Sequence, residues 1–553
     1  MLNYKRYKAN PVLDFPERTW PNKQIEKAPI WCSVDLRDGN QALVEPMNVD
    51  EKMELFDLLL KLGFKEIEIG FPAASQIEFD FLRQLVKENK IPSDVKVQVL
   101  SQCREELIDR TFEAIQGIPN VIFHIYNSTS TLQRDVVFNA DKEEIIEIAK
   151  AGTQMVKDRL DRYNGNLQLE YSPESFTGTE VEFALDICTA VQETWNHATE
   201  APIIFNLPAT VEMNTPNVYA DQIEWMSTHF KDRENIILSI HPHNDRGTGV
   251  AITELGLLAG ADRVEGCLFG NGERTGNLDI VTVALNMFSE GVDPELDFSN
   301  LPDIADSYQE YTKMEINPRS PYAGGLAYTA LSGGHQDAIA KGFAARDKMS
   351  EDAIWDVPYL LIDPHDIGRK YEGIIRINSQ SGKGGSSFIL EHNYGYAIPK
   401  AMQSAIGDLI KAKSDEAQRE LQSEEILKFF EDQWINRKSP LCVLDLASTQ
   451  VESADEKEHV ACRGVINWNG EKLSIGGKGN GPLDSFVAAL AETPVPKFNI
   501  TAFHEHSVGQ GSDTYAVAYV QITKEDGSQK WGVGKSSNVG KAGIGAVVSA
   551  LNQ

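Results

Sequence analysis

Three polar clusters, each placed directly after a predicted strand, carry the side chains best suited to chemistry: residues 35–38 (DLRD), 241–243 (HPH) and 270–277 (GNGERTGN). The histidines of HPH stand at positions i and i+2, so both imidazoles project from one face of an extended backbone. Two imidazoles and the Asp38 carboxylate suit a divalent metal, and an amide carbonyl such as that of Asn277 favours Mg²⁺ or Mn²⁺. The clusters therefore predict a metal site. The plainer alternative is that Asp38 caps a turn and the histidines satisfy hydrogen bonds in the core.

Arg37 lies beside Asp38 and has a chemical task that suits it. A guanidinium next to a metal stabilises the oxyanion that develops when a ketone is attacked. The alternative is an arginine that only pairs with a neighbouring carboxylate. Further strand ends supply side chains that can line a small polar pocket: His124, Glu170, Ser172, Glu174, Asn206 and Thr210.

The elements that must position these residues follow from hydrophobic patterning. Short apolar runs predict strands at 29–34, 64–69, 95–100, 121–126, 167–171, 202–207, 236–240 and 263–267. Their continuous hydrophobicity is typical of strands buried on both faces. Helical patterns separate them, and in the first of these Asp50 is the expected N-cap and Gly63 the expected stop. Eight β/α units over roughly 260 residues predict a TIM barrel, in which functional residues gather at the carboxyl ends of the strands.

The chain changes character after the barrel. Loops alternate with helices up to a charged helix expected over 414–437, and β-like runs (LCVLDLAS, HVACRGVINW, YAVAYVQIT) then return with helices near 482–491 and 540–551. We predict four parts: an N-terminal arm (1–28), an α/β TIM-barrel catalytic domain (29–300), helical linker subdomains (301–438) and a small α+β regulatory domain (439–553). The loop GGKGNG lacks both GK[ST] and GxGxxG spacing, so it does not predict a nucleotide site.

Composition narrows the class of protein. The 553 residues carry a formal net charge of -30, which disfavours nucleic acid and anionic membranes as partners. Six scattered cysteines without a CxxC pair indicate reduced thiols rather than a disulfide framework. The N-terminus has no apolar core of a signal peptide, and no apolar run approaches the roughly 20 residues of a membrane span. We therefore expect a cytoplasmic protein.

The motifs resemble those of the 2-isopropylmalate synthase family, in its longer, bacterial-type branch. The similar blocks occur in the family's order: WCSVDLRDGNQAL, FHIYNSTS, LEYSPESFTGTE, NLPATVEMNTPN, SIHPHNDRGTGVA and EGCLFGNGERTGN. The resemblance implies a Claisen-type condensation of acetyl-CoA with 2-oxoisovalerate and water, which gives 2-isopropylmalate and CoA in leucine biosynthesis. It also implies one divalent metal per subunit, Mg²⁺ with Mn²⁺ or Zn²⁺ as alternatives.

Individual residues acquire roles through this resemblance. It implies a metal held by Asp38, His241, His243 and Asn277. It implies that Arg37 polarises the keto oxygen, that Thr210 holds the substrate carboxylate and that Leu100 contacts the isopropyl group. His124, Ser172 and Glu174 would shape the pocket, with Glu174 counted among the catalytic residues.

The remaining implications concern the segments after the barrel. The family's proposed base is a histidine from the linker of the partner subunit, assisted by a tyrosine, and His335 and Tyr359 match these positions. The resemblance thus implies a homodimer, and its C-terminal domain implies feedback inhibition by leucine. A plainer interpretation of His335 is a neighbour of a helix N-cap. Two other functions stay open: a sister synthase for another 2-oxo acid, of homocitrate or citramalate type, and a leucine-binding regulator with an inactive barrel.

Overall fold

The computed structural model describes residues 13–330, 332–350, 353–371, 383–417, 421–451, 459–509 and 514–553. It divides into two compact units, one comprising Met1–Tyr328 with Leu361–Lys370 and the other comprising Thr329–Leu360 with Tyr371–Gln553. No helix among the described residues combines the length and the hydropathy needed to cross a bilayer.

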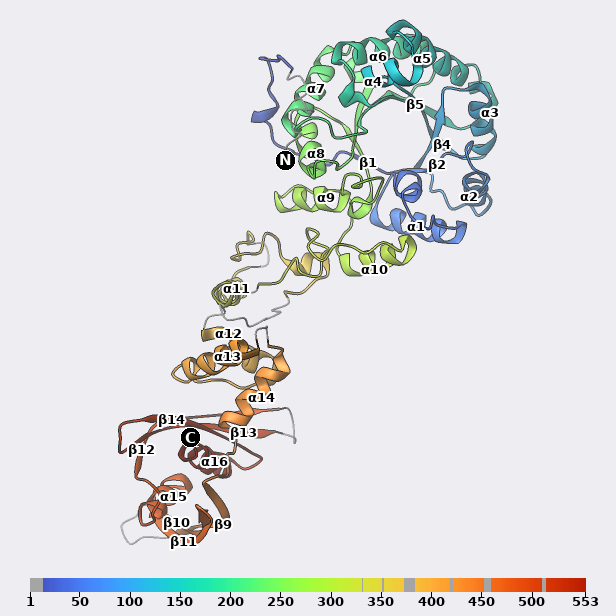
Figure 1. Ribbon diagram of the computed structural model, residues 1–553. Coiled ribbons are helices and arrows are strands. Elements are labelled where there is room, and N and C mark those ends of the chain that lie inside the picture. The colour runs from blue at the N-terminus through green and yellow to red at the C-terminus, as the bar shows by residue number, and fades with distance from the viewer. Residues whose placement is uncertain are drawn as a thin grey trace. The chain divides into compact units, whose positions relative to one another are not determined.

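The first unit is built on a closed barrel of eight parallel strands in sequential order, ringed by helices (Figure 1). All eight predicted strands are present, so the predicted TIM-barrel fold is confirmed. The strands are β1 (Ile30–Ser33), β2 (Glu66–Gly70), β3 (Lys96–Gln102), β4 (Asn120–Ser128), β5 (Asn166–Glu174), β6 (Ile203–Ala209), β7 (Ile236–Pro242) and β8 (Arg263–Gly266).

A helix follows each strand as predicted. The helices are α1 (Val49–Leu62), α2 (Gln76–Lys87), α3 (Glu105–Ala114), α4 (Thr131–Gln133), α5 (Lys142–Lys157), α6 (Val181–Trp195), α7 (Pro216–His229), α8 (Gly249–Leu258) and α9 (Ile280–Ser289). One further short helix among these, α4, lies between β4 and α5 and was not predicted. The expected N-cap of α1 was wrong: Asn48, not Asp50, caps the helix and shares a capping box with Glu51. Gly63 ends α1 as predicted, at a positive φ of 102° that suits glycine.

The interior of the barrel is polar, although its strands are buried. In β2, for example, Glu66 and Glu68 alternate with Ile67 and Ile69, and all four are buried. Arg263 is completely buried among these carboxylates, and its Nε lies 2.6 Å from Glu66 Oε2. The expectation of continuously hydrophobic strands is therefore wrong for β2, because the inward positions carry an ion-pair network instead of apolar layers.

Helices continue the chain beyond the barrel. They are α10 (Leu301–Thr312), α11 (Gly333–Arg346), α12 (Lys383–Tyr394), α13 (Gln403–Ala417) and α14 (Ser423–Trp434). The single charged helix predicted over 414–437 was wrong. Gln422 has extended backbone and caps α14 through a capping box with Glu425, so a new helix begins there.

The C-terminal residues form two similar β-β-β-α arrangements, each with a three-stranded antiparallel sheet followed by a helix. The first contains β9 (Leu441–Val451), β10 (His459–Trp468), β11 (Glu471–Gly479) and α15 (Pro482–Ala491). The second contains β12 (Phe498–Val508), β13 (Tyr515–Lys524), β14 (Gln529–Ser536) and α16 (Val539–Leu551). The predicted α+β class and both predicted helices are confirmed. The internal repetition was not predicted, because the two halves share a pattern of elements rather than a sequence motif.

Candidate active site

A cavity of about 210 Å³ opens at the carboxyl ends of the barrel strands. It brings together nine of the residues predicted from sequence: Arg37, Asp38, Leu100, His124, Ser172, Glu174, Asn206, Thr210 and His241. Phe71, Tyr126 and Pro208 also line it and were not predicted. Their positions next to strand ends were the available signal, but residues of these types are common there in any barrel.

Asp38, His241 and His243 converge as the sequence predicted. Their ligand atoms all lie within 4.8 Å of one another, and all three residues are buried. Asp38 Oδ2 is 3.2 Å from His241 Nε2 and 3.6 Å from His243 Nε2. This geometry forms a candidate metal centre from side chains 203 residues apart in sequence.

The protonation states of Asp38 and His243 favour metal binding. Burial alone would raise the pKa of Asp38, but the Arg37 guanidinium and the hydrogen bond to His241 hold it well below its usual range. Burial and the neighbouring His241 lower the pKa of His243 to about 4. A carboxylate and a neutral imidazole are the states in which these two side chains bind a cation.

Asn277 completes the set and provides a test of whether a metal fits. Its Nδ2 lies 2.9 Å from Asp38 Oδ2, while its buried Oδ1 has no hydrogen-bond partner among the described residues. The buried Nδ1 of His243 is likewise without a partner there. Unpaired buried polar atoms are costly, and a rotation of the amide that turns Oδ1 toward Asp38 would supply a carbonyl ligand. The four side chains therefore fit a divalent cation.

Glu265 contacts the His241 ring at Nδ1, the nitrogen that does not face Asp38. The carboxylate is completely buried, and its Oε2 lies 2.7 Å from His241 Nδ1. Such a contact orients the ring so that Nε2 lies 3.2 Å from Asp38 Oδ2, where a bound cation would replace the proton between them. Burial would lower the pKa of His241, but the hydrogen bonds to Asp38 and Glu265 raise it to about 9. Sequence reasoning missed Glu265, since a glutamate inside a predicted apolar strand gives no sign of its partner.

Arg37 contacts two carboxylates at once. Its Nε lies 2.6 Å from Glu68 Oε2 and its Nη1 lies 2.8 Å from Asp38 Oδ1. The plain alternative from the sequence, a paired arginine, thus describes part of its surroundings. Since 14% of the side chain remains exposed and it lines the cavity, the guanidinium also faces the space where a substrate would bind.

Hydrogen bonds fix the walls of the cavity. His124 Nε2 lies 2.7 Å from Ser172 Oγ, and Asn206 donates to the same hydroxyl at 3.1 Å. Thr210 Oγ1 accepts from the backbone N–H of Ser175 at 3.0 Å. These bonds join the ends of β4, β5 and β6, so the small pocket has preformed polar walls.

The comparison with known proteins gives a family. Residues 28–307 match the HMGL-like family model. Over 554 aligned residues the chain is 53% identical to the 2-isopropylmalate synthase of Clostridium acetobutylicum, covering 100% of this chain and 99% of that protein. The 2-isopropylmalate synthase of Acetoanaerobium sticklandii is 51% identical, at 100% and 97% coverage, and that of Helicobacter hepaticus is 50% identical, at 100% of both chains. The chain belongs to the 2-isopropylmalate synthase family.

Two further family models match beyond the barrel. Residues 325–391 match the post-catalytic domain of alpha-isopropylmalate synthase, and residues 420–553 match the LeuA allosteric (dimerisation) domain. For this member of the 2-isopropylmalate synthase family, the barrel cavity is accordingly the candidate active site.

His335 and Tyr359, the two other predicted catalytic residues, lie together in the second unit. Their rings stack with centroids 4.0 Å apart, and 63% of Tyr359 is exposed. Tyr359 has a positive φ of 66°, a strained conformation for a bulky residue that is often found at functional sites. The structure thus pairs the two residues and presents them at a surface.

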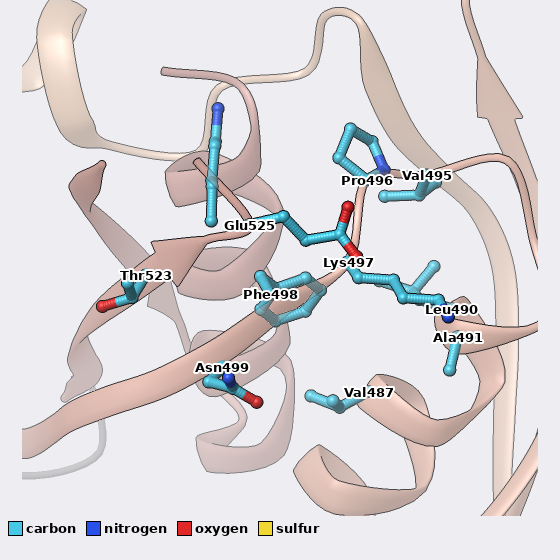
Figure 2. Close-up of a pocket in the computed structure, with 11 residues that line it drawn as sticks. Val487, Leu490, Ala491, Val495, Pro496, Lys497, Phe498, Asn499, Thr523 and Glu525 are labelled. Atoms are coloured by element: carbon cyan, nitrogen blue, oxygen red, sulfur yellow. The ribbon is translucent and has the colours of Figure 1, made fainter. Parts of the chain in front are cut away.

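Another cavity, of about 320 Å³, lies in the C-terminal part between α15, β12 and β13 (Figure 2). Phe498 and Leu490 contribute to its apolar lining, and Lys497 and Glu525 contribute charged side chains. It contains none of the residues predicted from the sequence.

Proposed function

We propose that the barrel site condenses acetyl-CoA with 2-oxoisovalerate to give 2-isopropylmalate, and that leucine inhibits this reaction. The observation that carries the proposal is the convergence of Asp38, His241 and His243 beside Arg37, in a chain about half identical to 2-isopropylmalate synthases over its full length.

Asp38, His241, His243 and Asn277 would hold one divalent cation, with Mg²⁺ preferred to Mn²⁺ or Zn²⁺ because two of the four ligands offer oxygen. When bound, such a cation supplies Lewis-acid polarisation of a carbonyl oxygen. Glu265 keeps His241 in the tautomer that can serve as a ligand.

Side chains that line the cavity bind and orient the 2-oxo acid. Arg37 donates to the keto oxygen and stabilises the negative charge that develops there. Thr210 binds the carboxylate of the 2-oxo acid. Leu100, which is 8% exposed at the end of β3, packs against the isopropyl group. His124, Ser172 and Glu174 complete the pocket and exclude longer or charged substituents.

Bond making then follows in three steps. The His335 imidazole, assisted by Tyr359, takes a proton from the acetyl methyl group. The methyl carbon bonds to the keto carbon as the C=O π bond breaks, and the keto oxygen takes up a proton from solvent, to which His335 releases the proton that it removed. Water then adds to the thioester, the C–S bond breaks, and CoA leaves as a thiol. The family's base comes from the partner subunit, and residues 420–553 match the LeuA allosteric (dimerisation) domain, so we propose that a second copy of the chain supplies His335 and Tyr359 and that the enzyme is a homodimer.

The four-part division of the chain belongs to this proposal. An arm (1–28), a barrel (29–300), linker subdomains (301–438) and a regulatory domain (439–553) are supported by the family models, which match 28–307, 325–391 and 420–553. The LeuA allosteric (dimerisation) model over the last of these supports both leucine regulation and dimerisation.

The test is CoA release, followed with a thiol reagent in the presence of acetyl-CoA, 2-oxoisovalerate and Mg²⁺ or Mn²⁺. We expect release that needs both substrates and disappears after EDTA treatment, and that leucine suppresses. Pyruvate and 2-oxoglutarate in place of 2-oxoisovalerate test the citramalate and homocitrate alternatives, and faster release with either would replace the proposed substrate.

The assignment of the base has its own test. His335→Ala is expected to lower turnover by about 100-fold or more, the usual contribution of a general base, while metal affinity is retained. Turnover close to that of the unaltered protein would remove His335 from the mechanism.

A further inference from the structure

The segment that carries Arg37 and Asp38 is a single turn of π-helix, Asp35–Gly39, between β1 and α1. Its backbone is unusual, since the N–H groups of Arg37, Asp38 and Gly39 all point to one carbonyl, that of Val34, at 3.2, 2.9 and 3.1 Å. Three donors sharing one acceptor form weaker bonds than a regular helical ladder does. Short π-helical turns recur at functional sites, where other contacts must hold them.

The first residue of the turn is held by a buried carboxylate. Asp35 Oδ1 accepts from the hydroxyl of Tyr308 at 2.8 Å, and the Leu268 N–H lies 3.1 and 3.2 Å from the two carboxylate oxygens. Ser33 Oγ donates to Oδ2 at 2.9 Å. Asp35 and Tyr308 are almost completely buried, so these donors replace water that the carboxylate has lost.

The last residue of the turn is held from the same side. The carbonyl of Gly39 accepts from Asn271 Nδ2 at 3.2 Å. A Cβ on Gly39 would meet that amide at 3.2 Å and Cys267 Sγ at 3.3 Å, so only glycine fits without displacement. Both ends of the turn are therefore tied to the loop after β8.

Tyr308 contacts the turn from outside the eight β/α units of the barrel. It lies on α10, which packs beside α1 at the edge of the barrel (Figure 1). Its ring contacts that of Phe269 with centroids 5.2 Å apart, so the hydroxyl is held in place toward Asp35. The first helix after the barrel, α10, thus supplies a side chain that hydrogen-bonds to the first residue of the Asp35–Gly39 turn.

We infer that Tyr308 and Asp35 are positioning residues, which hold the Asp35–Gly39 turn so that Arg37 and Asp38 face the cavity. Neither touches the reacting atoms. The inference rests on the proposed function for its catalytic consequence, and it also predicts a change in metal binding that can be measured without turnover.

The experiment uses the full chain with Tyr308→Phe, which removes one hydroxyl and keeps the ring against Phe269. Tyr311→Phe is the matched control, because Tyr311 lies on the same helix one turn further on. Binding of Mn²⁺ is measured by calorimetry, backbone hydrogen exchange is measured over residues 34–41, and turnover is measured by CoA release.

For Tyr308→Phe we expect Mn²⁺ affinity to fall about tenfold, the lower end of the effect seen for direct hydrogen-bond partners of a ligand, because Tyr308 acts on Asp38 through Asp35 and the turn. We also expect faster exchange in residues 34–41 and a lower kcat with a smaller change in KM. Tyr311→Phe should leave all three unchanged. The inference is overturned if Tyr308→Phe binds Mn²⁺ as the unaltered protein does, or if it only lowers global stability while exchange over 34–41 stays the same.

Asp35→Asn provides a second variant of nearly equal size, which can still accept from Tyr308 but with a neutral oxygen. We expect it to weaken Mn²⁺ binding in the same direction, and unchanged binding counts against the inference. If neither substrate is turned over by the unaltered protein, the proposed function fails, whereas the Mn²⁺ and exchange measurements still decide the role of Tyr308.

Discussion

Lys52 and Glu78 form a buried ion pair next to the Asp35–Gly39 turn. We predict that the two partners differ in how much free energy of unfolding is lost when each one is removed. Lys52 on α1 has no exposed side-chain surface and contacts Glu78 on α2, whose side chain is 17% exposed. Lys52 Nζ also lies 3.5 Å from the carbonyl of Leu36, within the turn that carries Asp38. Removing either partner of such a pair leaves a buried charge, which typically costs about 3–5 kcal/mol.

We expect Glu78→Gln to be the more damaging change at pH 7, because the remaining ammonium is fully buried and keeps uncharged neighbours in place of the carboxylate: the new amide, the Leu36 carbonyl at 3.5 Å and the Phe81 ring, whose centroid is 5.4 Å away. Lys52→Met leaves a carboxylate that retains some access to water and should cost less. The double variant with methionine at both positions should recover at least half of the larger loss, which gives a coupling free energy of about 2 kcal/mol or more.

The pH dependence follows from the sign of the pKa shift. Burial lowers the pKa of Lys52 from its ordinary value, although Glu78 opposes this, so loss of Glu78 lowers it further. The unfolded chain then binds more protons than the folded one, and stability rises with pH until the unfolded lysine titrates. The deficit of Glu78→Gln relative to the unaltered protein should therefore shrink between pH 7 and pH 9.5.

Equilibrium urea unfolding of the full chain at both pH values measures these free energies. The exposed pair Lys65–Asp94 is the control: both side chains are 62% exposed at 2.6 Å, and its removal should cost less than about 1 kcal/mol. The reasoning is refuted if the Lys52 and Glu78 changes are additive, or if Glu78→Gln loses the same free energy at both pH values.

Three further changes test other parts of the molecule. Glu265→Gln should weaken Mn²⁺ binding by about 10- to 100-fold in calorimetry, because His241 loses its charged partner, and unchanged affinity would contradict this role. Leu100→Ala should shift the preference of the barrel toward 2-oxo acids with larger apolar groups by about tenfold in kcat/KM, and an unaltered preference would place the isopropyl group elsewhere. Arg134 lowers the pKa of Glu180 to about 2 against the effect of burial, so the Glu180–Arg134 pair stabilises the protein above pH 4.5 and loses this effect as pH falls. The melting-temperature difference between Glu180→Gln and the unaltered protein should accordingly narrow from pH 6 to pH 3, and a constant difference would show that the charge is not responsible.

Much of the catalytic part could be predicted from the order of residues along the chain. Short runs rich in β-branched and aromatic residues alternate with longer helical patterns, so local patterning was enough to place eight β/α units. A closed parallel barrel brings the carboxyl ends of all its strands to one rim. Asp38, His241 and His243 could therefore be expected to meet although they lie far apart in sequence.

The sequence did not predict where the charged helix expected over 414–437 is interrupted, or which side chains fill the interior of the barrel. Helix α14 begins anew after Gln422, because the capping box of Gln422 with Glu425 stabilises a helix start there. The periodic spacing of apolar residues hardly changes across this break, so the pattern did not reveal it. Glu66, Glu68 and Glu265 looked like polar interruptions of apolar strands, and only the closed barrel pairs them with Arg263, Arg37 and His241.

What the sequence determined by itself was thus the list of elements and the rim at which its chemical groups gather, since both depend on spacing along one chain. Tertiary structure decided how those groups are held. The Asp35–Gly39 turn, its anchors at Tyr308 and Asn271, and the contact of Glu265 with His241 join residues from different elements at distances near 3 Å. Contacts of that kind depend on how whole helices and strands pack, and no local pattern encodes them.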